Sequence, residues 1–261
     1  MSHEARYRTM IIPAAGAGTR LGSALPKLLV PVDGRPMIGH LLDLYAPLVD
    51  RVVLVVAPAA RQAVERHVAP RPTPVEVAIQ ERPTGMLDAI LAAYARVLDT
   101  TPTEVWITWC DQVGVRRETV DELARRIEAG RAALVFPTHT GPTPYIHFDR
   151  DSEGRLVGVR QRREGDTMPE VGESDIGLFA MMGRTYLQAL PEFGHRAEAG
   201  RKTGERNFLP FIPWLGTRQP IDTFPCRDAM EAVGINTPDD LMAITAYLRR
   251  RNATGREAER A

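Results

Sequence analysis

The sequence contains little cysteine and little lysine. Its 261 residues include two cysteines, Cys110 and Cys226, and neither stands in a CxxC pair. Zinc-binding and dithiol redox motifs use such pairs, so neither motif is predicted, and we expect a cytoplasmic protein with reduced thiols. Lys27 and Lys202 are the only lysines, and arginine supplies the rest of the basic side chains. The position of each lysine therefore calls for a reason.

The sequence also lacks a net charge and a long apolar segment. Lys plus Arg and Asp plus Glu each number 33, so the formal net charge is zero. Nucleic-acid-binding proteins usually carry a basic excess, so we predict no nucleic-acid partner. No apolar stretch approaches the roughly 20 residues that cross a bilayer, and the polar start MSHEARYRTM lacks the apolar core of a signal peptide. We therefore predict no membrane partner, and any anion site must be local.

The sequence does contain an alternation of strand and helix patterns. Apolar, β-branched runs predict strands at residues 10–14, 51–57, 75–80, 104–110 and 131–136. Helical patterns lie between them at residues 36–46, 59–68, 86–98 and 117–129. This alternation predicts an α/β fold of the Rossmann-like three-layer α/β/α type, with a mostly parallel twisted sheet covered on both faces.

The pattern changes after residue 137, where proline, glycine and charged residues become frequent. The turn DSEG lies between two strand-like runs and predicts a hairpin. Residues 174–181 predict a further strand, and residues 238–251 predict a final helix. The charged tail at 251–261 is expected to be disordered. We therefore predict one domain over residues 1–250 with a small β-rich insertion.

A glycine-rich turn with two cations follows the first predicted strand. Residues 11–27 read IIPAAGAGTRLGSALPK. Glycine lets backbone N–H groups converge on an anion, and ligands of α/β sheets bind where strands end. Arg20 adds a planar donor fork suited to phosphate oxygens, and Lys27 adds a compact point charge. The residue types therefore indicate a phosphate-binding loop.

Three explanations of this turn compete on the residues alone. A dinucleotide-binding fingerprint would need a third glycine at Leu21, after Gly16 and Gly18, and an acidic residue near the end of the next strand, which the chain lacks. A P-loop would need G-K-[ST] after the turn, which is also missing. The third explanation is a structural turn that bears solvated charges.

The segment from Ala14 to Lys27 resembles the loop G-x-G-T-R-[ML]-x-S-x-L-P-K of the sugar-phosphate nucleotidyltransferases, and VPVDGRPMI (30–38) continues the similarity. In that family the loop wraps the triphosphate of an NTP. The resemblance implies a nucleotide-binding set in this loop: Ala14, Ala15, Gly16, Gly18, Thr19, Arg20 and Lys27. Arg20 and Lys27 would bind the phosphates and act in catalysis.

A second segment, QERPTGMLDAI (80–90), resembles the base-recognition segment Q-x-x-x-x-G-T-x-x-A of the same family. The resemblance implies that Gln80 reads a pyrimidine edge and that Gly85 lies beside the base. An amide offers both a donor and an acceptor, which complements a uracil imide. Met86 replaces the family's threonine. The alternative for Gln80 is a polar residue that ends a strand.

Two further segments imply a metal site. WITWCDQVGV (106–115) resembles the strand-end motif G-D-x-P, and EAVGINTPDDL (231–241) resembles G-[IV]-N-[TD]-x-x-D-L. The resemblance implies that Asp111 and Asn236 bind Mg²⁺, which commonly takes one or two protein ligands and completes its shell with phosphate and water oxygens. Helix capping is the alternative for each residue.

The resemblance is weakest in the middle of the chain. In N-acetylglucosamine-1-phosphate uridylyltransferases, which the chain otherwise resembles, this region recognises the sugar through a glutamate and an asparagine. Gln161 and Asp175 stand at those positions here. With Tyr145 and Lys202 they form the predicted acceptor-binding set, within an acceptor-binding subregion at about 137–225. The resemblance extends over the uridylyltransferase part of those bifunctional enzymes, and we expect no counterpart of their C-terminal acetyltransferase domain.

The resemblance implies a Mg²⁺-dependent nucleotidyltransferase. It would join an NTP, with UTP favoured and CTP or dTTP as alternatives, to a sugar phosphate or a related phosphate or phosphonate acceptor, and release pyrophosphate. The expected partners are the NTP and a small phosphorylated acceptor, and a homo-oligomer is compatible with the sequence. The alternative function is a catalytically inactive, nucleotide-binding regulatory module. A third interpretation, a dehydrogenase, is disfavoured by the missing third glycine.

Overall fold

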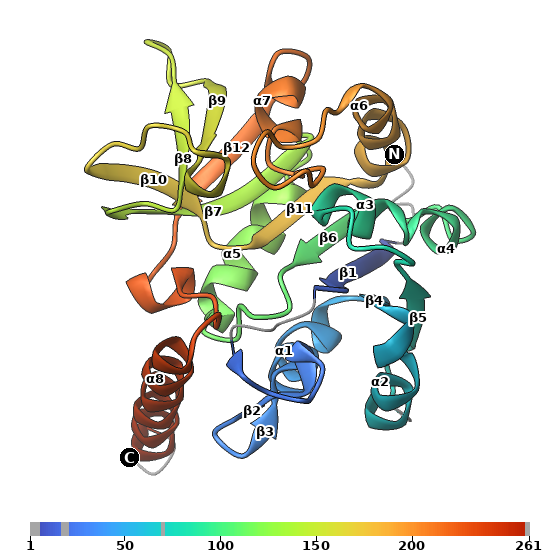
Figure 1. The fold of residues 1–261 in the computed structure, drawn as a ribbon, viewed down its shortest axis with the longest axis vertical. Helices are drawn as coiled ribbons and strands as arrows, with labels where there is room; N and C mark the ends of the chain where they lie inside the picture. Colours follow the sequence, from blue (N-terminus) through green and yellow to red (C-terminus); the bar gives the residue numbers. More distant parts are fainter. Residues whose placement is uncertain (1–5, 17–20, 69–70, 259–261) are drawn as a thin grey trace.

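The computed structural model describes residues 6–16, 21–68, 71–258 of the chain. An eight-stranded sheet forms its centre (Figure 1). Its strands are β1 (Arg8–Ala14), β4 (Arg51–Val56), β5 (Val75–Ile79), β6 (Glu104–Thr108), β7 (Leu134–Pro142), β10 (Val171–Asp175), β11 (Leu178–Met182) and β12 (Ile221–Pro225).

The sheet is mixed, and its centre is parallel. Along the sheet, β6, β1, β4 and β5 are parallel neighbours. Strand β11 runs antiparallel between β6 and β7, while β12 pairs parallel and β10 antiparallel with β7. The predicted α/β fold with a mostly parallel sheet is confirmed. Because β6, β1, β4 and β5 are parallel, their carboxyl ends share one edge of the sheet, which is where such folds bind ligands.

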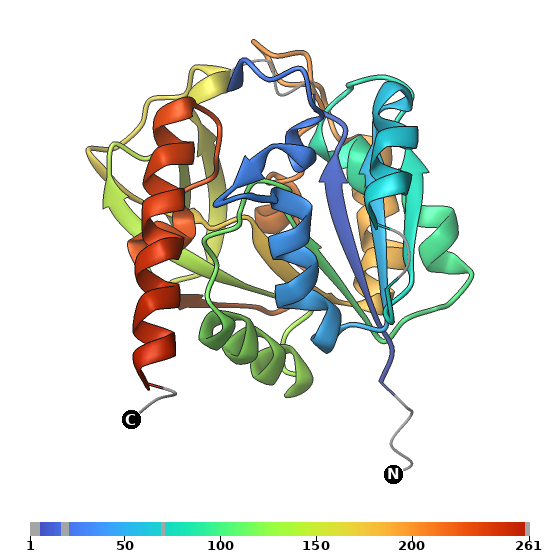
Figure 2. The ribbon, with the colours of Figure 1, turned by 90° about the horizontal axis from the view of Figure 1, so that it is seen from below.

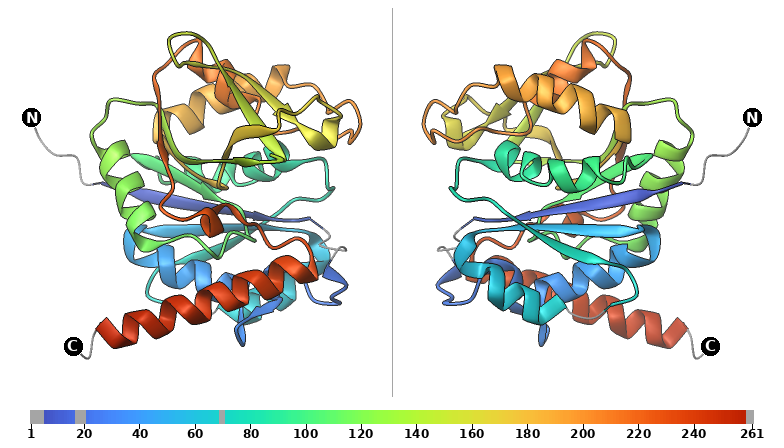
Figure 3. Two further views of the ribbon diagram at one scale, coloured as in Figure 1. Left: turned by 90° about the vertical axis from the view of Figure 1, so that its left-hand side faces the viewer. Right: turned by 90° about the vertical axis from the view of Figure 1, so that its right-hand side faces the viewer.

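Helices cover both faces of the sheet. They are α1 (Met37–Tyr45), α2 (Arg61–Val68), α3 (Met86–Leu91), α4 (Tyr94–Leu98), α5 (Arg117–Glu128), α6 (Leu190–Arg196), α7 (Phe211–Gly216) and α8 (Pro238–Ala258). The shorter turns are η2 (Lys27–Leu29), η3 (Ala46–Leu48), η4 (Pro58–Ala60), η5 (Arg162–Glu164), the π-helical η6 (Thr185–Ala189) and η7 (Ala229–Ala232). Figure 2 shows α1, α2, α5 and α8 in front of the sheet, and Figure 3 shows α6 and α7 on its opposite side.

The alternation of side chains along β1 separates two hydrophobic cores. Met10 and Ile12 pack in the core under α1, α2, α5 and α8, whereas Ile11 packs in the core under α3, α6 and α7. All three residues are fully buried. Successive side chains of a strand point to opposite faces, so a strand covered on both faces is apolar at every position. This is why the sequence shows continuous apolar runs.

The β-rich insertion contains the predicted hairpin. Strands β8 (Ile146–Arg150) and β9 (Leu156–Gln161) pair antiparallel around the DSEG turn, and a small ribbon of β2 (Pro31–Val32) and β3 (Arg35–Pro36) lies elsewhere in the chain. The strand predicted at 174–181 is in fact the end of β10 and most of β11. Gly177, with φ of +72°, interrupts it in a left-handed conformation that extended strands do not adopt.

Two helical predictions differ from the structure. The pattern at 86–98 forms two helices. The Ala93 N–H donates to the Ile90 carbonyl, three residues back as in a 3-10 turn, and this turn ends α3 before α4 begins. The tail predicted as disordered continues α8 to Ala258, since no proline interrupts it after Pro238. Residues 259–261 lie outside the described residues. Over the described ranges, no helix is both long enough and apolar enough to cross a membrane.

Candidate functional site

Three residues predicted from distant segments meet at one edge of the sheet. The Lys27 ammonium donates to Asp111 Oδ2 at 2.5 Å and to Asn236 Oδ1 at 2.9 Å. The side chains of Lys27 and Asp111 are 13% and 14% exposed, so this ion pair is largely shielded from water. Charges interact more strongly where water is partly excluded, so the attraction between Lys27 and Asp111 is stronger than that of an exposed ion pair.

Local structure places each of the three residues. Lys27 opens η2, whose next two residues, Leu28 and Leu29, are buried in the core and hold the turn against the sheet. Asp111 follows the end of β6 after two residues. The Ile235 N–H donates to the Asp111 carbonyl at 3.2 Å, which ties the segment before α8 to this loop. The carboxyl end of a buried strand thus carries a carboxylate into the shared edge of the sheet.

The helix that follows Asn236 is capped by another residue. Thr237 Oγ1 accepts from the Asp240 N–H at 3.2 Å, and Asp240 Oδ2 accepts from the N–H groups of Asn236 and Thr237 at 3.0 and 2.8 Å. This reciprocal arrangement is a capping box with Thr237 as the capping residue. The Asn236 side chain does not cap α8, and its carbonyl oxygen faces Lys27 instead.

The donor set of this cluster suits a hard cation. Asp111 Oδ2 and Asn236 Oδ1 both lie within hydrogen-bond distance of one positively charged nitrogen, so the two oxygens converge on a single cation. Among the described residues, no group of three or more His, Cys, Asp or Glu side chains could hold a metal ion. One carboxylate and one amide oxygen match the sparse protein shell that Mg²⁺ takes beside phosphates and water.

The glycine-rich loop lies directly beside this cluster in the sheet order. Ala14 and Ala15 are buried at the end of β1, and Gly16 is exposed, with open space where a side chain would be. Gly18, Thr19 and Arg20 lie outside the described residues. Since β1 is flanked by β6 on one side and by β4 and then β5 on the other, the described start of the loop, Ala14 to Gly16, leaves the sheet between the strands that precede Asp111 and Gln80.

The two residues of the predicted base segment contact each other. The Gln80 side-chain amide donates to the Gly85 carbonyl at 3.0 Å, and Gln80 is only 8% exposed at the end of β5. Gly85 has φ of +124° and immediately precedes α3. The structure therefore joins Gln80 and Gly85 into one turn, with Met86 as the first residue of the helix.

The predicted acceptor residue Asp175 is linked to the Asp111 loop. Asp175 Oδ1 accepts from the Gly177 N–H at 2.7 Å, and the Trp109 N–H donates to the Gly177 carbonyl at 2.9 Å. Burial raises the pKa of Asp175 to about 6, although hydrogen bonds from Gly177 and from Trp109 lower it. The Asp175 carboxyl group can therefore change protonation near neutral pH. It lies two residues before Gly177, which packs against Trp109.

The other predicted acceptor residues differ in burial, although Tyr145 and Gln161 lie at the same end of the β8–β9 hairpin, where the Arg162 N–H donates to the Tyr145 carbonyl at 3.0 Å. Tyr145 is 52% exposed just before β8, whereas Gln161 is buried on β9. Lys202 is exposed, and its side chain lies against Gly165. Burial raises the pKa of the Cys110 thiol, next to Asp111, to about 12.

A buried carboxylate holds the loop that carries Lys202. Glu164 is 7% exposed and accepts hydrogen bonds from the Thr203 hydroxyl at 2.5 Å, from the Lys202 N–H at 3.0 Å and from the Asn207 amide at 3.1 Å. Burial alone would raise the pKa of Glu164, but these hydrogen bonds outweigh it and hold the pKa at about 2.

Acid should weaken this contact. The folded-state pKa of Glu164 lies below its ordinary 4.5, so its ionised form stabilises the fold above pH 4.5, and the stabilisation is lost as the pH falls toward 2. Glu164→Gln should lower the free energy of unfolding at pH 7 by about 1–3 kcal/mol, because one of the two acceptor oxygens becomes an N–H₂ group that faces buried donors. Urea unfolding of both proteins between pH 7 and 2.5 should show the difference shrinking with acid. The control is Glu65→Gln, which removes the carboxylate of an exposed helical pair with Arg61. Equal stability of Glu164→Gln and the wild type at pH 7 would contradict the role of Glu164 in holding this loop.

Several structural residues of the site carry no signal in the sequence. Glu231 is fully buried and accepts from the N–H groups of Arg116 and Arg227, which fixes the segment before Asn236 to the loop after Asp111. Arg206 likewise contacts the turn around Gly85. Both residues resemble ordinary surface charges until the chain is folded, since Arg116 lies far from Glu231 in the sequence and the turn around Gly85 lies far from Arg206.

Comparison with known proteins gives consistent matches. The model of the MobA-like NTP transferase domain matches residues 10–202. A bifunctional protein GlmU of Thermus thermophilus is 31% identical over 244 residues, which cover 92% of this chain and 52% of that protein. The bifunctional protein GlmU of Rhizorhabdus wittichii is 29% identical over 246 residues, which cover 92% and 53%, respectively. That of Parvibaculum lavamentivorans is 37% identical over 158 residues, which cover 59% and 34%. The chain spans about half the length of the first two relatives.

Proposed function

The chain belongs to the MobA-like NTP transferase domain family, and from this membership we propose that it is a Mg²⁺-dependent nucleotidyltransferase. It would join an NTP, with UTP favoured, to a small phosphorylated acceptor such as a sugar phosphate, and release pyrophosphate. The observation that carries the proposal is the contact of Lys27 with both Asp111 and Asn236 beside the glycine-rich loop. The order of β6, β1, β4 and β5 supports it, because the chain from Ala14 to Gly16 follows a strand that lies between those that precede Asp111 and Gln80.

The proposed reaction is an in-line displacement at phosphorus. An acceptor phosphate oxygen forms a bond to the α-phosphorus, and the bond from that phosphorus to the bridging oxygen of the β-phosphate breaks. The electron pair of that bond leaves with pyrophosphate. The acceptor oxygen is already anionic, so a general base is not required. Catalysis then depends on positioning and on stabilisation of charge.

The residues of this chain would divide that work. Asp111 and Asn236 would hold Mg²⁺, which supplies charge neutralisation for the phosphate oxygens when it is bound. Lys27 would stabilise negative charge on the transferred phosphate, and Arg20 would do so on the leaving group, as the family resemblance implies. Gln80 would hold the base, and Gln161, Asp175, Tyr145 and Lys202 are proposed to contact the acceptor.

The experiment is a pyrophosphate-release assay with Mg²⁺, run across four NTPs and a panel of sugar phosphates, alcohol phosphates and phosphonates. We expect release that requires one preferred NTP, one acceptor and the metal. Tight NTP binding in the same preparation without release from any acceptor would instead favour the regulatory module. Failure to bind any NTP would exclude both functions.

A further inference from the structure

The backbone of Arg206 forms hydrogen bonds with the turn of the predicted base segment. Its N–H donates to the Thr84 carbonyl at 2.7 Å, and its own carbonyl accepts from the Leu87 N–H at 3.0 Å. The two hydrogen bonds lie on either side of Gly85 in the sequence. A residue more than a hundred positions away therefore defines the conformation of this turn.

Gly85 is required by this contact. A Cβ atom at Gly85 would lie 2.5 Å from the Arg206 nitrogen and closer still to its carbonyl oxygen, which is nearer than real Cβ atoms come to backbone. The Gly85 carbonyl in turn accepts from the Gln80 side chain at 3.0 Å. A continuous series of contacts thus runs from Arg206 through Gly85 to the amide that is proposed to read the base.

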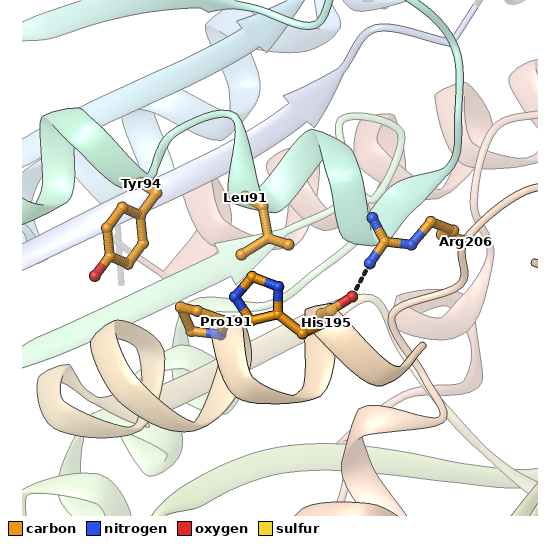
Figure 4. A pocket seen from close by; sticks show the side chains of 6 residues that line it. Leu91, Tyr94, Pro191, His195 and Arg206 are labelled. Atoms are coloured by element: carbon orange, nitrogen blue, oxygen red, sulfur yellow. Dashed lines mark hydrogen bonds between the residues drawn. The ribbon is translucent and has the colours of Figure 1, made fainter. Parts of the chain in front are cut away.

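The Arg206 side chain fixes the same turn from its other side. The guanidinium donates to the Asp88 carboxylate in the first turn of α3. It also donates to the Gly194 carbonyl of α6, a bond that Figure 4 marks with a dashed line. Figure 4 shows it at the edge of a hollow that also contains Leu91 and His195. Since α3 begins directly after Gly85, the guanidinium clamps the start of this helix to α6.

Arg206 belongs to the loop that carries Lys202. The loop closes on itself through a bridge between Ala199 and Arg206 and through a hydrogen bond from the Gly200 N–H to the Glu205 carbonyl at 2.8 Å. Glu164 accepts hydrogen bonds from Lys202 and Thr203, which lie between these closing contacts. The loop from Ala199 to Arg206 therefore contains Lys202, a residue of the proposed acceptor site, and also contacts the proposed base site.

We propose that Arg206 is a positioning residue for the nucleotide base. It shapes the turn at Gly85 and thereby sets the orientation of Gln80, which contacts the base itself. This inference rests on the proposed function. It explains why the base-recognition turn depends on a loop from the acceptor side of the molecule, and it predicts that loss of the guanidinium weakens recognition of the base without affecting recognition of the phosphates.

The test compares Arg206→Met with the wild type by calorimetry in the presence of Mg²⁺. The probes are UTP, CTP and dTTP, together with inorganic tripolyphosphate, which has no base. We expect the dissociation constant for the preferred nucleotide to rise about tenfold, as for loss of hydrogen bonds to a charged group, and that for tripolyphosphate to stay unchanged. In turnover assays, KM for the nucleotide should rise while kcat changes by less than about twofold. Arg206→Lys, which keeps a charge that reaches one acceptor, should recover part of the affinity.

Arg126→Met is the matched control. The Arg126 side chain is 31% exposed, as is that of Arg206, and it also binds two partners, Glu122 and Asp222, but on α5 and β12. The Arg126→Met variant should have a lower free energy of unfolding than the wild type but the same affinity for nucleotides. If Arg206→Met does not fold, Asp88→Asn, which removes one partner, should show a smaller effect of the same sign.

The outcomes are distinguishable. Wild-type affinity of Arg206→Met for every nucleotide, or equal losses for UTP and tripolyphosphate, would overturn the positioning role and leave the proposed function intact. A wild-type protein that binds tripolyphosphate but no nucleotide, or neither, would overturn the proposed function, and the positioning role with it.

Discussion

Asp111→Asn should abolish turnover while the fold survives. The substitution removes the only carboxylate that contacts the Lys27 ammonium in the described part of the chain, and with it the charge that would hold a divalent cation beside Asn236. Loss of one charge that stabilises a phosphoryl-transfer transition state costs on the order of 10²–10³ in rate, and we expect at least that loss in kcat/KM. The measurement is pyrophosphate release at saturating Mg²⁺, with the preferred NTP and acceptor.

A surface carboxylate provides the control for this variant. Asp222 pairs with Arg126 at 3.0 Å and is 40% exposed. Asp222→Asn should keep wild-type turnover, because an exposed ion pair contributes only about 0–1 kcal/mol to stability. Thermal unfolding should show that Asp111→Asn remains folded. Wild-type activity of a folded Asp111→Asn protein would refute the metal assignment.

Lys27→Met should have two effects of opposite sign. Turnover should fall by about 10²–10³-fold, because the charge that faces the transferred phosphate is lost. Binding of Mn²⁺ in the absence of nucleotide should instead become tighter. The Lys27 ammonium contacts both proposed metal ligands, and two like charges about 4 Å apart repel by about 1 kcal/mol even in bulk water, which corresponds to roughly fivefold in affinity.

Electron paramagnetic resonance of Mn²⁺ separates these two effects, because it reports metal binding without turnover. Arg126→Met, which removes a positive charge elsewhere, should leave the Mn²⁺ affinity unchanged. Weaker Mn²⁺ binding to Lys27→Met would show that the lysine supports the two oxygens rather than competing for them. Unchanged turnover would remove Lys27 from the catalytic set.

Particular residues show how far the sequence could be interpreted. The strands that form the parallel centre of the sheet were predicted because residues buried on both faces are apolar without interruption, as in RVVLVV of β4. The break between β10 and β11 was missed, since Gly177 adopts its left-handed conformation to fit against Trp109, which the local pattern does not reveal. Helices α6 and α7 were also missed, because they are short and their apolar residues face a core built by other segments.

For the site, the sequence by itself determined the residue types and their order. Gly16, Lys27, Gln80, Asp111 and Asn236 stand in motifs whose spacing is local, so strand ends and turns could place each of them at the edge of a sheet. Chemical character is likewise local: a carboxylate, an amide and an ammonium keep their donor and acceptor properties wherever the chain puts them.

Only the tertiary structure decided which of these groups meet. It brought Lys27 into contact with both Asp111 and Asn236, assigned the cap of α8 to Thr237, and made Arg206 the support of Gly85. The contacts of Lys27 and Arg206 join segments that lie far apart in the sequence and meet only through the pairing of strands and the packing of helices. The cap is local, and the structure only decides between the neighbours Asn236 and Thr237. Protonation was decided in the same way, because the burial of Asp175 and the hydrogen bonds to Glu164 move their pKa values in opposite directions.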